Sequence, residues 1–304
     1  MQGFFSKGEY SGTKPKTFLQ VRGKPNTLPL KTVFLLLAIA TAVVFCLPYR
    51  HLFFCETVQF GQFSEPAENI FISPGIARKE HAKILRMLET AENRVNAFWG
   101  EKKGRATVIV CATPAEYGRY CPNKEGAGCS LGTFYGNSFI VLNLYGINPD
   151  VISHEMCHNE VFSRLGWRKT TFAIPQWFNE GLAMMLDYRF VNTPNSAARY
   201  ERYLKEWRLR TVPPAKKLRL AEISTLNGFF GGDARHVTLA YLTAATEVSH
   251  WLLLVGQKGL IQWTEAIQRG DRFEVYYEIE NLHRKITPHP GNPVRRLDQA
   301  QPSE

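Results

Sequence analysis

Two histidines and a glutamate stand at a spacing that suits a catalytic metal, in the run His154-Glu155-Met156-Cys157-His158. Residues four apart lie on one face of a helix, about one turn from each other, so both imidazoles reach the same ion. Glu155 lies about 100° round the helix, where its carboxylate contacts a water on that ion without binding the ion. The spacing predicts zinc bound by His154 and His158, with Glu155 as the general base. The alternative is an amphipathic helix with two surface histidines, since such matches arise by chance in on the order of one chain in a hundred.

The residues that follow His158 do not supply the third ligand that a catalytic zinc needs. Such a zinc takes three protein ligands and keeps one position open. In metzincins the third ligand is a histidine six residues after the second one, with a glycine between them. Arg164 occupies that position here, and Val161 replaces the glycine. The third ligand must therefore come from another part of the chain.

The segment from Pro175 to Ala183, PQWFNEGLA, offers that ligand. It resembles the W-x-N-E-G-x-A segment of the gluzincin peptidases, the broad group that contains thermolysin and the zinc aminopeptidases. The resemblance covers roughly residues 135–265 and implies that Glu180 is the third zinc ligand. The gap of 22 residues from His158 to Glu180 is a few residues longer than in those enzymes, and the connection before Pro175 would absorb the difference. The alternative for Glu180 is a surface carboxylate at a helix start.

The resemblance also implies a reaction. A zinc-activated water would hydrolyse a peptide bond, with Glu155 accepting the water proton and delivering it to the leaving amine. In the aminopeptidase-like members a tyrosine on a later helix stabilises the oxyanion, and the run LAYLTAATEVSHWLLLVG resembles that helix. Tyr241 is the candidate for this role, and His236 is the second choice. The alternative for Tyr241 is a core residue whose hydroxyl is satisfied by the protein.

The expected substrate is a protein or a peptide. In the resembling enzymes an edge strand just upstream of the metal helix binds the extended substrate by backbone pairing, which the resemblance places at residues 138–144. The G-x-M-E-N motif that binds a free N-terminus in zinc aminopeptidases is absent, and Gly136-Asn137-Ser138 does not replace it. An endopeptidase is therefore favoured. The alternatives are a catalytically inactive membrane-tethered binding or scaffold module, and a zinc hydrolase of a non-protein amide such as a cell-wall crosslink.

The elements around these residues predict an α+β fold, mainly helical, with a small mixed or antiparallel sheet next to the metal helix. Asn148-Pro149-Asp150 is typical of a helix start, and Gly166 of a helix end. The apolar runs at 106–113 and 138–144 indicate buried strands. Helical spacing and helix breakers predict helices over residues 76–98, 150–165, 175–188, 196–208, 235–255 and 259–268.

An apolar segment near the N-terminus indicates a membrane anchor. Residues 32–47, TVFLLLAIATAVVFCL, carry no charge and are followed by Pro48, and with their flanks they just span a hydrocarbon core. The alternatives are a buried core helix and a cleaved signal peptide, although 31 residues precede the apolar run. Six basic residues before the segment, against the single acid Glu9, predict a cytoplasmic N-terminus and a catalytic domain on the outer side. In a bacterium that side is the periplasm.

The predicted organisation has five parts. They are a basic N-terminal tail (1–31), the transmembrane anchor (32–49), a tether (50–70), a zinc metallopeptidase-like domain (71–283) and a disordered C-terminal tail (284–304) rich in proline, arginine and polar residues.

Charge and cysteine content limit the partners and the compartment. The net charge is +10, half of it lies before the apolar segment, and the rest forms no Lys/Arg block with interleaved aromatics. Nucleic acid is therefore not an expected partner, whereas the lipid bilayer is. An outward-facing domain tolerates disulfides, so Cys121 and Cys129 either close the loop between them or remain two thiols in a turn. Cys157 is expected to be a small buried thiol that packs the metal helix.

Overall fold

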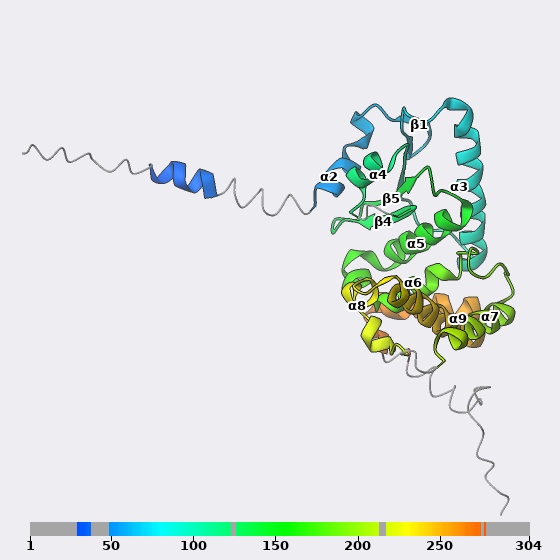
Figure 1. Cartoon of the computed structure of the whole chain (residues 1–304). Helices are drawn as coiled ribbons and strands as arrows, with labels where there is room; N and C mark the ends of the chain where they lie inside the picture. Colours follow the sequence, from blue (N-terminus) through cyan, green and yellow to red (C-terminus); the bar gives the residue numbers. More distant parts are fainter. Residues whose placement is uncertain (1–28, 38–48, 123–125, 213–216, 275–276, 278–304) are drawn as a thin grey trace, which may run out of the picture. The chain divides into compact units, whose positions relative to one another are not determined.

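The computed structural model describes residues 29–37, 49–122, 126–212, 217–274 and 277 of the chain. The chain divides into two compact units, Met1–Pro48 and Tyr49–Glu304, and the second unit carries all the candidate site residues (Figure 1). In the first unit residues 30–37 are helical and expose large apolar side chains such as Phe34 and Leu35. Residues 38–48 of the predicted anchor and the predicted disordered tail at 284–304 lie outside the described residues. Within the described ranges, no helix combines the length and apolarity needed to cross a membrane.

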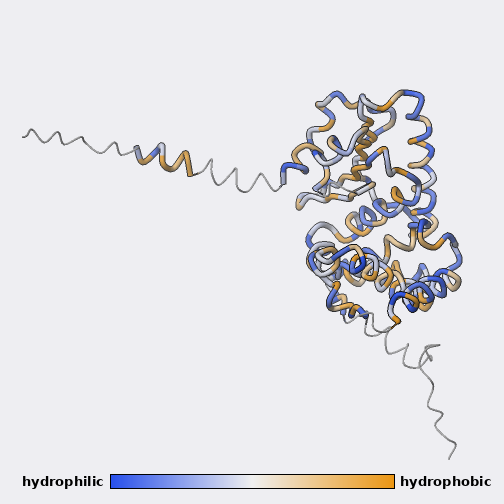
Figure 2. The backbone as a smooth tube through the Cα atoms, in the orientation of Figure 1, coloured by the Kyte–Doolittle hydropathy of each residue, from blue (hydrophilic) through white to orange (hydrophobic). Residues whose placement is uncertain are grey.

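A five-stranded mixed sheet forms one part of the second unit. The order of the strands is β1-β2-β3-β5-β4, in which β2, β3 and β5 run parallel and the two edge strands pair antiparallel with their neighbours. All six residues of β5 are buried because helices cover both faces of the sheet at this strand, and Figure 2 shows hydrophobic segments through the centre of the sheet. The strands are β1 (Ser64–Ala67), β2 (Ile70–Ile72), β3 (Thr107–Cys111), β4 (Gly128–Gly132) and β5 (Ser138–Asn143).

The segment predicted as a tether, residues 50–70, is instead part of the folded unit. It contains helix α2 (Arg50–Glu56), the 3-10 turn η1 (Val58–Phe60) and strand β1. Cys55 and Val58 are buried in a small second core together with side chains of β3, β5 and helix α4 (Pro114–Tyr120). The physical reason is that one face of the sheet is covered by α2 and α4, so the apolar residues of α2 are needed there. The folded domain therefore begins before the predicted residue 71.

The helices predicted from periodicity are confirmed, including their interruptions, except that the helix predicted over 175–188 ends at Met184. Gly166 in α5 and Gly256 in α9 both adopt positive φ, of 75° and 61°, and break their helices where the sequence predicts an end. The shorter elements η2 and α8, which lie between α7 and α9, were not predicted. The helices of this part are α3 (Arg78–Trp99), α5 (Pro149–Phe172), α6 (Gln176–Met184), α7 (Ser196–Arg210), η2 (Leu220–Ile223), α8 (Leu226–Phe230) and α9 (Ala234–Arg269).

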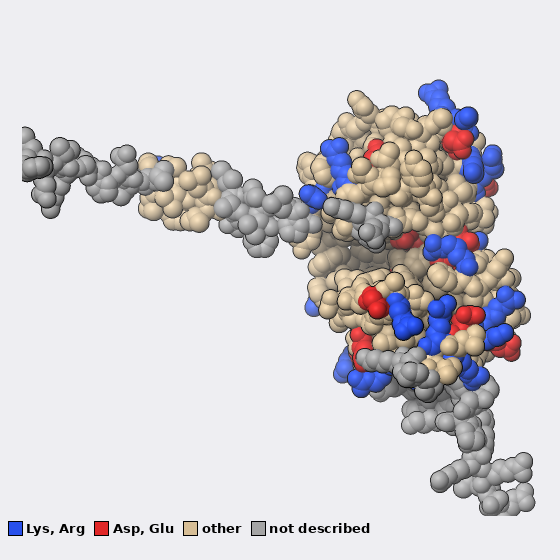
Figure 3. All heavy atoms as spheres, in the orientation of Figure 1, with Lys and Arg blue, Asp and Glu red and all other residues tan. Residues whose placement is uncertain are grey.

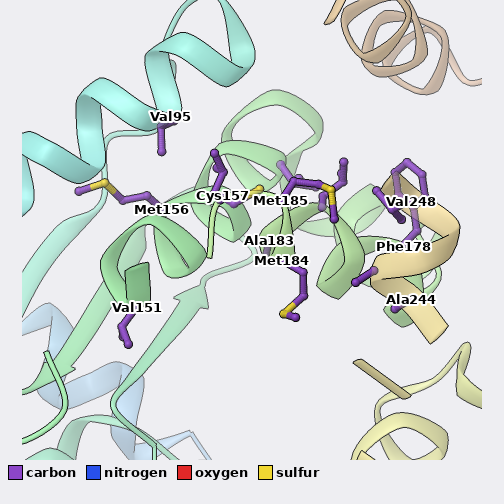
Figure 4. Packing of buried hydrophobic residues seen from close by; sticks show 14 of the residues in the cluster. Val95, Val151, Met156, Cys157, Phe178, Ala183, Met184, Met185, Ala244 and Val248 are labelled. Carbon is purple, nitrogen blue, oxygen red and sulfur yellow. The ribbon is translucent and has the colours of Figure 1, made fainter. Parts of the chain in front are cut away.

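Helix α5 lies at the centre of the main core. It contacts α3, β4, β5, α6 and α9 (Figure 1). In Figure 4 Val95 of α3 lies near Met156 and Cys157 of α5, and all three belong to the same buried cluster. Cys157 is fully buried, as expected for a packing thiol. Because α5 is enclosed in this way, the side chains on its site-facing side are fixed by the core beneath them.

Gly181 sets the distance between α6 and α9. A Cβ atom at this position would lie 2.4 Å from Cγ2 of Val248 and 2.8 Å from the carbonyl oxygen of Ala244. Only a glycine allows this close helix contact, and Figure 4 shows Ala244 and Val248 next to Phe178 of α6. The glycine that follows Glu180 therefore locks the helix that carries the predicted third ligand.

Candidate metal centre

Helix α5 brings the two predicted histidine ligands together. The side chain of Asn148 caps the start of the helix by accepting hydrogen bonds from the N–H groups of Asp150 and Val151. One turn further on, the rings of His154 and His158 lie on the same face with their centroids 4.9 Å apart. The pair is not the exposed pair of the alternative interpretation, because His154 is buried and His158 is partly buried.

Helix α6 brings Glu180 to the same point. Its Oε2 lies 3.4 Å from Nε2 of His154 and 3.7 Å from Nε2 of His158, and its Oε1 accepts a hydrogen bond of 2.8 Å from Gln176. Glu180 is only 4% exposed, which excludes the surface carboxylate of the alternative interpretation. The two nitrogens and the carboxylate oxygen lie within 4.8 Å of one another, so the three residues form a group that could hold a metal ion.

The carboxylate oxygen Oε2 of Glu180 is placed as a metal ligand would be. Oε2 of Glu180 is buried and accepts no hydrogen bond from a described residue, although it faces both imidazoles. A buried carboxylate oxygen without a donor is costly, and a cation between it and the two nitrogens removes that cost. Burial raises the pKa of Glu180, but the imidazoles of His158 and His154 outweigh this and hold the pKa below its ordinary value. The carboxylate is therefore ionised and ready to bind a cation.

The other nitrogen of each imidazole faces an oxygen acceptor. Nδ1 of His158 lies 3.2 Å from Oδ1 of Asn179, whereas Nδ1 of His154 lies 3.7 Å from Oδ2 of Asp187, which is beyond hydrogen-bonding distance but within reach of the negative charge. Asp187 is fully buried and also accepts hydrogen bonds from Arg189. Acceptors at Nδ1 favour the tautomer that keeps the lone pair on Nε2, the nitrogen that faces Glu180.

Asp187 is the site residue that sequence reasoning missed. It lies seven residues after Glu180, in the irregular segment that follows α6, so no helical spacing connects it to the motif. The available signal was an acid directly after the apolar run Ala183 to Leu186, because an acid in such a place is buried with a partner.

Glu155 lies beneath strand β4. It is 9% exposed, and a Cβ atom on Gly128 would lie 2.8 Å from its Cγ, so a glycine is needed where the strand crosses it. Burial raises the pKa of Glu155 to about 7, His158 lowers it and Glu180 raises it. A carboxyl group with a pKa near neutrality both accepts and releases a proton at physiological pH.

Tyr241 reaches the site and His236 does not. The ring of Tyr241 lies 6.4 Å from that of His154, centroid to centroid, and its side chain lines the cavity described below. Its hydroxyl forms no hydrogen bond with the described part of the protein, unlike the satisfied core tyrosine of the alternative interpretation. Burial raises the pKa of Tyr241, so the phenol remains a donor. Nε2 of His236 instead lies 2.8 Å from the carbonyl oxygen of Gly228, outside the cavity lining.

A cavity of about 780 Å³ opens over the metal group. It is lined by β4, α5, α6, α8 and Tyr241, and Figure 3 shows the molecule hollowed between the part that carries the sheet and the part that carries α6 to α9. Among its described lining residues no lysine or arginine occurs, and the carboxylates are Glu155, Glu180 and Glu274. A disulfide joins Cys121 and Cys129, so of the two alternatives that the sequence left open, a closed loop and two free thiols, the structure has the closed loop. Both cysteines line the cavity.

The edge strand at the cavity is β4 and not the predicted 138–144 segment. That segment forms β5, which is paired on both sides, whereas β4 is paired only with β5 among the described strands. Asn143 donates a hydrogen bond of 2.9 Å to the carbonyl oxygen of Ala127, so the odd-numbered residues of β4 exchange hydrogen bonds with β5. The backbone N–H and C=O groups of Gly128, Ser130 and Gly132 therefore point to the open edge.

Comparison with known proteins adds no further constraint on this site. The sequence matches no protein-family model and no curated protein, so what the group of His154, His158 and Glu180 does is judged on its own geometry.

Proposed function

We propose that this protein is a zinc-dependent peptidase of the gluzincin type. The observation that carries the proposal is the buried oxygen Oε2 of Glu180, which faces Nε2 of both His154 and His158 and accepts no hydrogen bond from the described residues. Two imidazole nitrogens and one carboxylate oxygen are a ligand set that zinc prefers at catalytic sites, where a fourth position stays open.

The protein's own groups have separate roles in hydrolysis. Bound zinc supplies a Lewis acid that polarises the scissile carbonyl and increases the acidity of water. Glu155, with a pKa of about 7, takes a proton from the attacking water and passes it to the leaving nitrogen as the C–N bond breaks. The phenol of Tyr241 donates a hydrogen bond to the carbonyl oxygen as negative charge develops on it. Asn179 orients the ring of His158 through the contact at Nδ1, and the negative charge of Asp187 near Nδ1 of His154 makes that imidazole a stronger ligand.

Strand β4 supports a peptide as the substrate. Its open edge presents the backbone groups of Gly128, Ser130 and Gly132 within the lining of the cavity. An extended peptide paired there would lie across the metal group and be held by main-chain hydrogen bonds, whatever its sequence. The absence of a G-x-M-E-N motif favours cleavage inside a chain over removal of its first residue.

We further propose that residues 32–49 anchor the enzyme in a membrane, with the N-terminus cytoplasmic and the catalytic domain outside. In its support, residues 30–37 form a helix whose apolar side chains are exposed, with Phe34 at 64% and Leu37 at 58%. Side chains of this kind are stable in lipid. A C-terminal reporter that is active only outside the cytoplasm tests the orientation, and an inactive reporter would contradict it.

The peptidase activity is tested by cleavage of casein by the purified full-length protein loaded with zinc. Glu155→Gln should retain the zinc and lose at least about a thousandfold in kcat, because it removes the base and keeps the ligands. The matched control is Glu274→Gln. This carboxyl group also lines the cavity but belongs to neither of the two sequence motifs that carry the metal group. If Glu155→Gln cleaves as fast as the control, Glu155 is not the base. A wild-type protein that holds zinc and cleaves no peptide would instead indicate a binding module or a hydrolase of another amide.

A further inference from the structure

A second cavity, of about 280 Å³, shares no lining residue with the one at the metal centre. It lies among α3, the start of α7, the break in α9 and the segment that follows α6. Two helix starts border it: Ser196 opens α7, and Gln257 resumes α9 after Gly256. Helix starts carry unpaired N–H groups and partial positive charge. The end of α3 at Trp99 and the end of the first part of α9 before Gly256 border the same cavity and carry the opposite partial charge, so the net charge of the cavity comes from its side chains.

Two arginines add full positive charges to the same cavity. Arg94 and Arg199 both line it, and their guanidinium carbons lie 4.0 Å and 4.5 Å from the ring centroid of Tyr188, which also lines it. Arg199 is only 4% exposed. Burial and the charge of Arg94 both lower the pKa of Arg199, while Tyr203 and Tyr188 act in the opposite direction. A guanidinium remains charged at neutral pH all the same.

The acids around these arginines balance only one of the two charges. Arg94 forms an ion pair with Asp150 at 2.6 Å. Arg199 donates to the carbonyl oxygens of Met184 and Thr193, and no carboxylate of the described residues pairs with it. A buried charge without a counter-charge is costly. The cavity therefore carries one positive charge in excess, on a guanidinium that is itself buried.

We propose that this cavity binds a small carboxylate that carries a short apolar group. A monoanion matches the single excess charge, whereas a phosphate dianion would leave one of its charges without a partner. Part of the remaining lining is apolar, with Phe98, Leu252 and Leu260, and this part suits an alkyl group next to the carboxylate. Each guanidinium has five N–H donors, of which the bonds to Asp150 and to the carbonyl oxygens use only some, so donors remain for a carboxylate.

Such a ligand would tie together parts of the chain that are distant in sequence. Arg94 also donates to the carbonyl oxygen of Leu186, and Arg199 to that of Met184. An anion between the two guanidinium groups would join α3 to α7 across the segment 184–194. Bound ligand should therefore raise the temperature of unfolding, and above the Kd the rise should grow with the logarithm of the ligand concentration.

The test uses the full-length protein and three sodium salts, each titrated in HEPES buffer at constant sodium concentration. The salts are butyrate, phosphate and chloride, and the readouts are the midpoint of thermal unfolding and the heat of binding. Butyrate should raise the midpoint, and its heat of binding should saturate at one site per chain. Phosphate and chloride should have effects at least about tenfold weaker at equal concentration. An equal or stronger response to phosphate or chloride would overturn the assignment to a carboxylate, and the absence of a saturable heat of butyrate binding would overturn the site.

Three variants localise the response. Arg199→Gln removes the excess charge and should weaken butyrate binding at least about tenfold. Ala97→Phe keeps both arginines but fills the cavity from an exposed position of its lining, so it should abolish the response even if Arg199→Gln does not fold. Arg202→Gln changes an exposed arginine on the same helix and should respond like wild type. A wild-type response in Arg199→Gln or in Ala97→Phe would refute the proposal.

Discussion

Each imidazole of the metal centre faces a side chain of a different kind, and this difference affects how strongly each imidazole binds the metal. His158 faces the neutral amide of Asn179, whereas His154 faces the buried carboxylate of Asp187. A carboxylate partner makes an imidazole a better electron donor than an amide does. Asp187 is therefore the residue outside the ligand group whose loss should weaken metal binding most.

The charge of Asp187 can be removed without changing the size of its side chain. Asp187→Asn should weaken zinc binding about 10- to 100-fold, because it removes the negative charge behind His154 and keeps the shape of the side chain. Zinc affinity is measured by competition with a chromophoric chelator. The matched control is Asp150→Asn, which also breaks an acid–arginine pair but touches neither histidine. Unchanged affinity in Asp187→Asn, or an equal loss in Asp150→Asn, would contradict the role of Asp187.

Strand β4 is the element that relates most directly to substrate binding. Its glycines let it lie close on α5: a Cβ on Gly128 would meet Glu155, and a Cβ on Gly132 would lie 2.2 Å from the ring of Phe162. The strand is thus held on two sides, by β5 and by α5, with one edge open. Hydrogen bonds at that edge belong to even-numbered residues and those to β5 belong to odd-numbered ones.

This alternation allows the open edge to be changed without changing the sheet. Ser130→Pro removes the N–H group of Ser130, which points away from β5, so the ladder between β4 and β5 should be preserved. One lost backbone hydrogen bond should lower kcat/KM for a long peptide about three- to tenfold, mainly through KM. Ser130→Ala retains the N–H group and serves as the control. If both variants cleave with the same KM, the peptide is not paired with β4.

The same elements show which parts of the structure the sequence could predict. The helix of His154 and the buried strands β3 and β5 have long, regular apolar patterns, and their predicted positions are confirmed. Strand β4, GCSLG, has two glycines and no β-branched residue, so it carries no strand signal of its own. It forms because β5 needs a partner and α5 tolerates only a glycine-rich strand beside it. Asp187 was missed for a similar reason, since tertiary packing alone brings it to His154.

At the scale of the whole molecule, two hydrophobic cores on opposite faces of one sheet stabilise the folded unit. The larger core contains α3, α5, α6 and α9, and the smaller one contains α2, α4 and parts of β3 and β5. The smaller core buries the thiols of Cys55 and Cys111. Burial, followed by the charge of Glu56, raises the pKa of Cys55 from the ordinary 9.0 to about 12, and burial raises the pKa of Cys111 as well.

Because burial raises the pKa of these thiols, we expect the protein to lose stability in alkali. The unfolded Cys55 thiol loses its proton near pH 9, whereas the folded thiol keeps its proton up to about pH 12, so ionisation favours the unfolded chain between these values. Ionisation of Cys55 should therefore not affect the midpoint of thermal unfolding below about pH 8. Above pH 9 the midpoint should fall as the pH rises. Cys55→Ala should reduce the slope of that fall. Val58→Ala, in the same core, should lower the midpoint without changing the slope, and an unchanged slope in Cys55→Ala would contradict the prediction.

The zinc content of the purified protein tests the central claim most directly. The measurement is zinc per chain by mass spectrometry after purification of full-length wild type, Glu180→Gln and Glu274→Gln without chelators. Wild type and Glu274→Gln should each hold close to one zinc per chain, and Glu180→Gln should hold far less because it loses the buried oxygen that faces both imidazoles. A metal-free wild type, or a full complement of zinc in Glu180→Gln, would contradict the proposed metal centre.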